Sequence, residues 1–178
     1  MTTVKPPTDV SEPALGIAPF DPAQLTEGRS FGDYVIGRRL GSGGMGSVYE
    51  ARQVSDGRVV ALKVLNVDLN KFDARDRFLR EGRSAAAVNH PNTVCVYRTE
   101  EIEGLPTICM ELVAAGTLEE RVKSSGALPF ADVVEFGIQM IEGLAAAHDV
   151  GVLHRDVKPA NCFVRLCEKT VVFAATSL

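Results

Sequence analysis

The feature that most constrains the fold is a glycine-rich segment between two runs that favour extended backbone. Residues 41–46 read GSGGMG, and they follow an apolar run over residues 34–40. In the next run, residues 47–52, Val48 and Tyr49 favour a strand. Glycines at this spacing let backbone N–H groups approach a phosphate without a Cβ in the way. The segment is therefore predicted to turn between two strands, either as a phosphate-binding loop or as a hairpin that binds nothing.

The strands around this loop exclude a dinucleotide-binding βαβ unit, which uses the same glycine spacing. That unit needs a helix that begins inside the motif and a parallel crossover to the next strand. Here residues 47–52 are followed by a hairpin-type turn at 55–57 and a third strand-like run at 59–65. Three strands joined by tight turns predict an antiparallel meander.

The rest of the chain adds a helix, two more strands and then helices. A helix is predicted over residues 73–89, where apolar side chains recur at helical spacing. Strands are predicted at 93–97 and 107–113, and helices at 117–124 and 129–148. Five antiparallel strands with one helix, followed by helices, indicate an α+β fold with two lobes.

This pattern divides the chain into four segments. We expect an N-lobe over residues 31–113, a partial C-lobe over 114–165 and an atypical C-terminal tail over 166–178. Residues 1–30 are rich in proline and poor in large apolar side chains. Such a composition buries too little surface to offset the entropy of ordering, so a disordered tail is predicted there.

Composition and charge narrow the range of partners. Of the 178 residues 46% are hydrophobic, so the chain can bury a core. The formal net charge of −4 argues against a nucleic-acid partner. The four cysteines form no C-x-x-C pair, which favours reduced thiols and a cytoplasmic location. No run approaches the ~20 apolar residues that a membrane-spanning helix needs, and residues 1–30 lack the apolar region of a signal peptide.

A charged residue interrupts the third predicted strand. Lys63 follows the apolar residues 60–62, and a buried ammonium is costly unless it has a partner. The ordinary alternative is a lysine that reaches solvent from a strand edge. The predicted helix supplies two candidate acidic partners, of which Glu81 is preferred and Asp76 stays open.

A third segment makes the pattern specific. Residues 152–161 read VLHRDVKPAN. In chain order, G-x-G-x-x-G-x-V at 41–48, V-A-x-K at 60–63 and H-R-D-x-x-x-x-N at 154–161 resemble the protein kinases. The residues of the first and third motifs are similar to those in the bacterial, Hanks-type serine/threonine kinases. By the same match His154 resembles a structural residue and not a catalytic base.

The resemblance implies a serine/threonine protein kinase that uses ATP and Mg²⁺ and phosphorylates a Ser or Thr hydroxyl of a protein substrate. Asp156 would accept the hydroxyl proton, Lys158 would steady the γ-phosphate, and Asn161 would bind magnesium. Lys63, oriented by Glu81, would hold the α- and β-phosphates. The residues that the match places around the nucleotide are Leu40, Gly41, Gly43, Gly46, Val48, Ala61, Met110, Glu111, Val113 and Phe163.

The chain departs from the family after the catalytic-loop asparagine. The aspartate of the Asp-Phe-Gly segment, a second magnesium ligand, is expected around residues 173–175, where the sequence reads Phe-Ala-Ala. Alanine cannot coordinate magnesium, which demands oxygen ligands. The chain thus resembles a kinase truncated after the catalytic loop, and the helix at 129–148 is expected to expose an apolar face.

Three functional hypotheses stay open. The first is a serine/threonine kinase that is inactive as it stands. The second is a non-catalytic nucleotide-binding module, a pseudokinase, which the missing Asp-Phe-Gly favours and the intact Lys63, Asp156 and Asn161 do not. The third is a truncated, non-functional product, which would explain both the well-formed motifs and the atypical ending.

Overall fold

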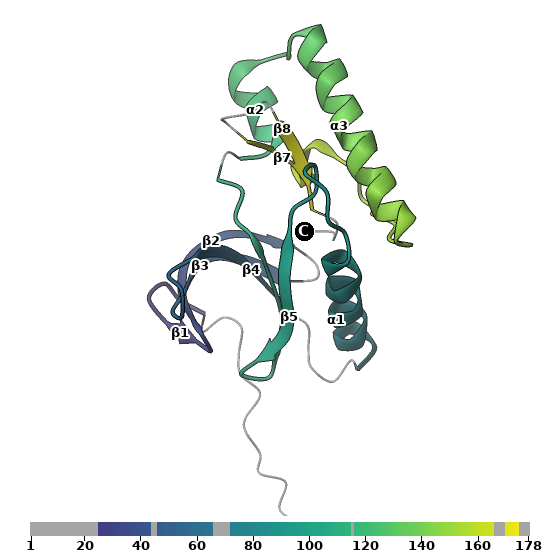
Figure 1. Ribbon diagram of the computed structural model, residues 1–178. Coiled ribbons are helices and arrows are strands. Elements are labelled where there is room, and N and C mark those ends of the chain that lie inside the picture. The colour runs from purple at the N-terminus through teal and green to yellow at the C-terminus, as the bar shows by residue number, and fades with distance from the viewer. Residues whose placement is uncertain (1–24, 44–45, 66–71, 115, 166–169, 175–178) are drawn as a thin grey trace, which may run out of the picture.

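The chain folds into two lobes, as the computed structural model shows in Figure 1. One lobe is a β-sheet with helix α1 (Phe72–Ala86), and the other holds helices α2 (Leu118–Ser125) and α3 (Phe130–Asp149) with a small β-hairpin. The predicted α+β, two-lobed fold is therefore confirmed. The structure describes residues 25–43, 46–65, 72–114, 116–165 and 170–174.

In the described part of the chain, six strands form one antiparallel sheet in the order β1-β2-β3-β4-β6-β5. The five predicted strands are present, and a short β1 is added, because buried Phe31 pairs with Tyr34 at the edge of the sheet. Gly57 and Gly104 lie in the tight turns that join neighbouring strands. Their φ angles of 75° and 81° are a conformation that glycine adopts without strain. The strands are β1 (Ser30–Phe31), β2 (Tyr34–Gly43), β3 (Gly46–Gln53), β4 (Val59–Leu65), β5 (Val96–Ile102) and β6 (Leu105–Glu111).

Strand β5 lies further along the chain than the predicted 93–97. Its charged residues, among them Arg98, Glu100 and Glu101, made this part of the sequence resemble a loop. Because β5 is an edge strand, these side chains can reach solvent and form ion pairs there, such as Arg98 with Glu100 at 3.7 Å. The polar stretch is thus a strand whose outer side is charged.

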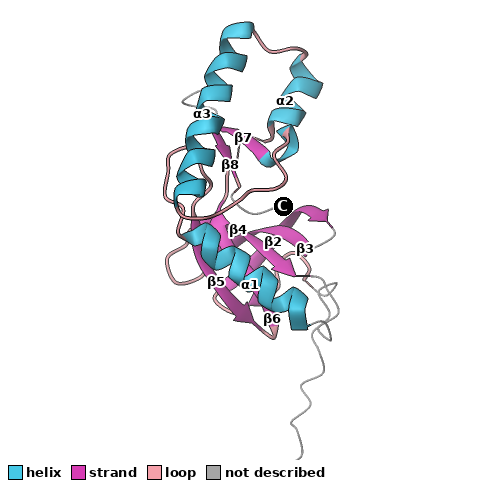
Figure 2. Cartoon of the chain, turned by 90° about the vertical axis from the view of Figure 1, so that its right-hand side faces the viewer, coloured by secondary structure: helices cyan, strands magenta, loops and turns pink. Residues whose placement is uncertain are grey.

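Helix α1 lies across one face of the sheet, against β5 and β6 (Figure 2). Gly82 permits this close approach, since a Cβ there would lie 2.8 Å from Cγ1 of Ile108 and 2.7 Å from Oγ1 of Thr99. The helix ends at Ala86 and not at the predicted 89. The next two N–H groups bond to carbonyls three residues back, which tightens the last turn and ends the α-helix.

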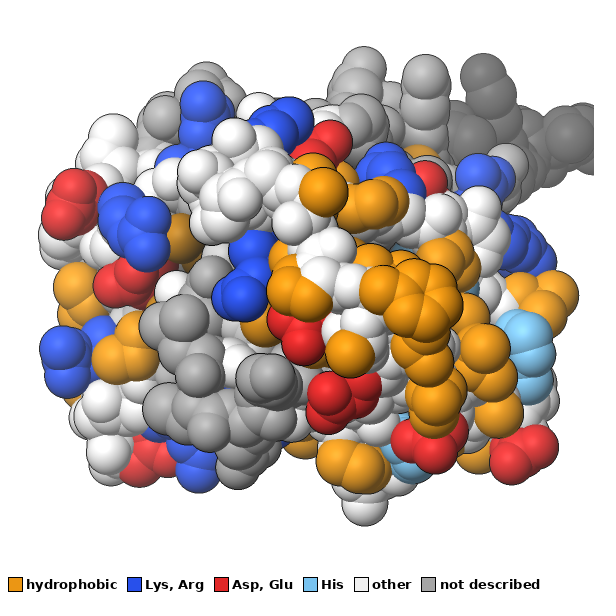
Figure 3. Space-filling model, turned by 90° about the horizontal axis from the view of Figure 1, so that it is seen from above, with side chains coloured by type: hydrophobic (Ala, Val, Ile, Leu, Met, Phe, Trp, Pro, Cys, Tyr) orange, Lys and Arg blue, Asp and Glu red, His pale blue; other side chains and the backbone are white. Residues whose placement is uncertain are grey.

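The two predicted C-lobe helices are confirmed to within one residue at each end. A reciprocal capping box starts α2: the Thr117 hydroxyl accepts the N–H of Glu120 at 3.1 Å, and the Glu120 carboxylate accepts the N–H of Thr117 at 2.8 Å. The expected apolar face of α3 is also present, and Phe130 is 83% exposed on it. Figure 3 shows hydrophobic side chains gathered at this end of the molecule. The exposed apolar residues of α3 are Phe130, Val133, Val134, Ile138 and Ile141.

The C-terminal segment corrects the prediction of an atypical tail over 166–178. Strand β8 (Thr170–Phe173) pairs with β7 (Cys162–Arg165) in an antiparallel hairpin. Val171 and Phe173 are buried, and a Cβ on Gly143 of α3 would lie only 2.6 Å from the Phe173 ring. A four-residue apolar run has no period that identifies it as a strand until its partner is known. Residues 166–169 and 175–178 lie outside the described residues.

The N-terminal end of the packed chain also differs from the prediction. Residues 1–24 of the predicted tail lie outside the described residues, but Leu25 is buried. The N–H of Gly28 donates to the carbonyl of Ile36, and the N–H of Ile36 donates to the carbonyl of Arg29, both at 2.8 Å. The sheet therefore begins to order the chain before residue 31. Among the described helices, none has the length and apolarity needed to cross a membrane.

Candidate active site

A cavity of about 560 Å³ lies between the two lobes. Its roof is formed by residues of β2, β3 and β4, and its floor by β7, Ala174 and the short 3₁₀ helix η2 (Pro159–Asn161). Lys158 and Asn161 of the predicted catalytic loop also line it. Ten of the eleven residues that the sequence placed around a nucleotide line this cavity, and Lys63 is not among the residues that line it. The ten are Leu40, Gly41, Gly43, Gly46, Val48, Ala61, Met110, Glu111, Val113 and Phe163.

The cavity also includes residues that the sequence did not single out. Arg38 and Glu50 lie at its roof and form an ion pair at 3.1 Å. Thr117 and Glu120, the capping box of α2, lie at its edge, and the spacing Thr-x-x-Glu could have been recognised in the sequence. Ala174 lies at the floor.

The glycines of the roof have different structural roles. Gly46 pairs with Gly43 across the β2–β3 hairpin, and a Cβ on Gly46 would lie 2.3 Å from the carbonyl oxygen of Val64. Gly46 is therefore required by the packing of β3 on β4. Gly41 has nothing within 4 Å of the place its Cβ would take. Packing does not require glycine at position 41, which leaves the approach of a ligand as a reason for it.

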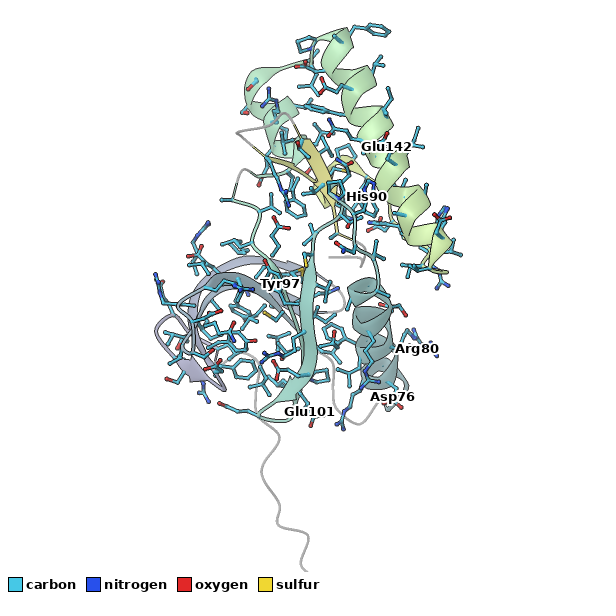
Figure 4. All side chains as sticks on the ribbon, in the orientation of Figure 1. Asp76, Arg80, His90, Tyr97, Glu101 and Glu142 are labelled. Carbon is cyan, nitrogen blue, oxygen red and sulfur yellow. The ribbon has the colours of Figure 1, made fainter. Side chains whose placement is uncertain are left out.

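Lys63 is buried in β4, with 2% of its surface exposed. Burial lowers the pKa of its ammonium, and the nearby negative charge of Glu81 acts in the opposite direction. The ammonium also lies 5.5 Å from the centre of the Phe78 ring. Asp76, the alternative partner, is exposed near the end of α1 that is remote from the C-lobe (Figure 4). The structure thus brings Glu81 and not Asp76 to Lys63.

The predicted catalytic loop forms a connected set of polar contacts. The ammonium of Lys158 lies 2.8 Å from Oδ2 of Asp156. The side-chain amide of Asn161 donates to the same oxygen at 3.0 Å and to the Asp156 carbonyl at 2.8 Å. These contacts with Lys158 and Asn161 lower the pKa of the Asp156 carboxyl, which therefore stays ionised at neutral pH. Arg155, with φ of 63°, makes the sharp bend that presents Asp156.

His154 is buried beneath this loop. Its Nδ1 accepts the backbone N–H of Asp156 at 3.2 Å, and its ring lies 5.3 Å from that of Phe173. Burial lowers the pKa of His154, which favours the neutral imidazole that this acceptor role requires. The predicted structural reading of His154 agrees with these contacts.

An ion pair joins the two lobes behind the cavity. Glu111, the last residue of β6, contacts the guanidinium of Arg165 on β7 at 2.5 Å, and both side chains are partly buried. The Glu111 N–H also donates to the carbonyl of Cys95 at 2.9 Å. Glu111 therefore anchors the connection between the lobes as well as lining the cavity.

The residues of the floor do not fit a magnesium ion. Ala174 follows β8 at the position where a second acidic ligand was expected, and it is 2% exposed. Its methyl group cannot bind a hard cation, which needs oxygen ligands. Among the described residues, no three His, Cys, Asp or Glu side chains gather as a metal site would require. Asn161 and Asp156 are the nearest candidates, and they bind each other.

Comparison with known proteins decides the family. The protein kinase domain matches this chain over residues 34–172. The chain belongs to the protein kinase family. This kinase-family chain is 39% identical over 148 residues to the probable serine/threonine-protein kinase pknA2 of Bifidobacterium longum, covering 81% of this chain and 19% of that protein. It is 41% identical over 139 residues to the serine/threonine-protein kinase PknJ of Mycobacterium tuberculosis. That match covers 78% of this chain and 23% of PknJ.

Solved structures agree with this assignment. The crystal structure of the M. tuberculosis PknI kinase domain superposes with a TM-score of 0.71 at 32% identity, covering 85% of this chain and 61% of that one. The chain thus spans about a fifth of the length of the curated relatives above and about three fifths of this kinase domain.

Proposed function

We propose that this chain binds ATP in the cavity between its lobes. The observation that carries the proposal is the shape and composition of that cavity. Apolar side chains of the roof, Val48 and Ala61, and of the floor, Phe163, line it together. Opposed apolar surfaces suit the two faces of a purine ring, and a volume of about 560 Å³ is within the range of ligand pockets. Backbone groups at the end of β6 and just after it, from Glu111 to Val113, can then bond to the edge of the base.

The polar residues provide places for the phosphates. In the described part of the glycine hairpin, Gly41 offers its backbone N–H with no side chain in the way. Lys63 and Lys158 supply positive charge from the roof lobe and the floor lobe. Glu81 is proposed to orient Lys63. These roles follow the family resemblance, and the positions of the residues support them.

The reaction proposed for the family is transfer of the γ-phosphate to a Ser or Thr hydroxyl of a protein substrate. In this chain Asp156 would accept the hydroxyl proton, since its carboxyl is ionised and its orientation is fixed by Asn161 and Lys158. Lys158 would steady the transferred phosphate. Ala174 favours a second function, binding of the nucleotide without transfer, because a group that helps to stabilise the transferred charge is missing. We therefore propose binding as the function of this chain and transfer as the activity of its family.

The binding proposal is tested by thermal unfolding of the whole chain with and without ATP. At a ligand concentration of 100 times the Kd, binding stabilises the folded state by about 2.7 kcal/mol, which shifts the melting temperature by several degrees. Ala61→Phe should abolish the shift, because the ring would occupy the cavity. Val59→Phe, which places the same ring at an exposed position of the same strand, should keep it. No ATP-dependent shift in the unmodified chain at millimolar nucleotide would contradict the proposal.

A further inference from the structure

The floor of the cavity fixes Ala174 in place by packing and hydrogen bonds. Just before it, the N–H of Phe173 donates to the carbonyl of Asn92 at 3.1 Å, and the Phe173 carbonyl accepts the N–H of Val94 at 2.9 Å. The N–H of Ala174 lies 3.4 Å from the carbonyl of Asn161 that accepts it. Position 174 is thus held between β8 and the catalytic loop. The methyl group that lines the cavity is a fixed feature of the fold.

The remaining polar residues at the floor are held by hydrogen bonds, Asp156 through its carboxylate oxygen and Asn161 through its amide nitrogen. Oδ2 of Asp156 accepts hydrogen bonds from both Lys158, at 2.8 Å, and Asn161, at 3.0 Å. The Asn161 amide is held by a second bond, to the Asp156 carbonyl at 2.8 Å. One carboxylate and one amide oxygen, without the acid that position 174 would supply, are a poor ligand set for an ion that takes six oxygens in a near-octahedral arrangement.

Two lysines can supply the positive charge that a metal would otherwise bring to the phosphates. Lys158 lines the cavity, and half of its side chain is exposed, so it can turn from Asp156 toward a bound anion. Lys63 is not among the residues that line the cavity, but it lies two positions beyond Ala61 on β4, and alternate residues of a strand share a face. A buried ammonium gains more from a bound anion than an exposed one does, because the pair is poorly screened by water.

We propose that this cavity binds the phosphates of adenine nucleotides without requiring a divalent metal ion. The inference rests on the proposed nucleotide binding and adds the chemical form of the ligand. Alanine at position 174 removes the protein group that would make the nucleotide's affinity depend on magnesium. The lysines and the backbone N–H groups of the glycine hairpin bind the phosphates directly.

The test is isothermal titration of the whole chain with ADP, once in excess Mg²⁺ and once in EDTA. ADP is the probe because its bound phosphates test the floor without a turnover step. The measured quantity is the ratio of the two affinities, with magnesium and without it. We expect a ratio within about twofold of one, because no protein ligand recognises the metal.

Two variants at position 174 extend the test. Ala174→Asp restores a carboxylate, which repels the free nucleotide in EDTA and binds it through the metal when magnesium is present, so the ratio should rise by about tenfold or more. Ala174→Asn has the same size without the charge, and its ratio should stay within about threefold of one, because a neutral amide is a weak magnesium ligand. Thermal unfolding of each variant without ligand shows whether it is folded.

The outcomes separate this inference from the function on which it rests. ADP that binds equally well in both buffers, or more tightly in EDTA, supports both. ADP that binds only with magnesium, or at least about tenfold more tightly with it, overturns the metal-free inference and leaves nucleotide binding standing. No binding of ADP in either buffer overturns the proposed function and this inference with it. The unmodified chain alone decides among these results, even if Ala174→Asp does not fold.

Discussion

The roof and the floor of the cavity differ in how their structural and chemical roles are divided. In the roof, one element serves both roles: the glycine hairpin packs on β4 through Gly46 and leaves its backbone open at Gly41. In the floor, the two roles lie on adjacent residues. Phe173 packs the hairpin against α3, and Ala174 occupies the position where a metal ligand was expected. A floor built in this way can keep its shape while it loses a chemical group.

The desolvation cost of a charged group explains why the fold does not need a metal ligand at position 174. Ala174 is buried beside Val172 and Phe173, in an apolar environment. A carboxylate there would carry a desolvation cost unless it were bound to a cation. Alanine removes both the cost and the metal site. The comparison therefore predicts that packing variants of the floor change stability strongly, whereas alanine at position 174 is compatible with a stable floor.

The largest effect is expected for Phe173→Ala. The Phe173 ring is 3% exposed and contacts His154 and α3, so its removal should leave a cavity and cost about 3–5 kcal/mol of unfolding free energy. Chemical denaturation with urea measures the loss. Phe130→Ala is the matched control in the same lobe, because Phe130 is 83% exposed and should change stability by less than about 0.5 kcal/mol. Equal losses in the two variants would contradict the packing of β8 described above.

A smaller loss is expected in the roof for Gly46→Ala. The new methyl group would collide with the Val64 carbonyl, and separating β3 from β4 should cost about 1–3 kcal/mol. Gly41→Ala has free space for its methyl group and should be close to neutral in stability. Thermal unfolding of both variants makes the comparison. A loss at Gly41 as large as that at Gly46 would show that packing, and not an open approach to ligand, requires glycine at both positions.

The sequence predicted the roof better than the floor, for physical reasons. Strands β2 to β4 have tight turns between them and apolar residues along their length, so local patterns identify them. The polar β5 was misplaced, because an edge strand tolerates charged side chains that resemble a loop in sequence. Strand β8 was missed, since its burial depends on contacts with Asn92, Val94 and Gly143, which are distant in the chain. Ten of the predicted nucleotide contacts line one cavity, but only the fold shows that the Asn161 amide donates a hydrogen bond to Asp156 at its floor.

The smallest effect is expected at Lys63 in the roof lobe, where the pH dependence of the unfolding free energy reports the cost of burying a charge. Because burial lowers its pKa in the folded state, the unfolded chain holds more protons as pH rises toward the ordinary lysine value of 10.5. The free energy of unfolding should therefore rise with pH in the window between the folded and unfolded pKa values, and the penalty for the charged lysine should be fully present below that window.

Lys63→Met should lack this rise. Urea denaturation of Lys63→Met and of the unmodified chain, from neutral to alkaline pH, measures the difference in unfolding free energy and separates the contribution of Lys63 from that of other groups. Lys123→Met, at a position where the side chain is 71% exposed, should keep the rise of the unmodified chain. A pH dependence that is the same in Lys63→Met and the unmodified chain would show that Glu81 and its surroundings compensate the burial of the ammonium in full, and a bound anion would then be unnecessary to stabilise it.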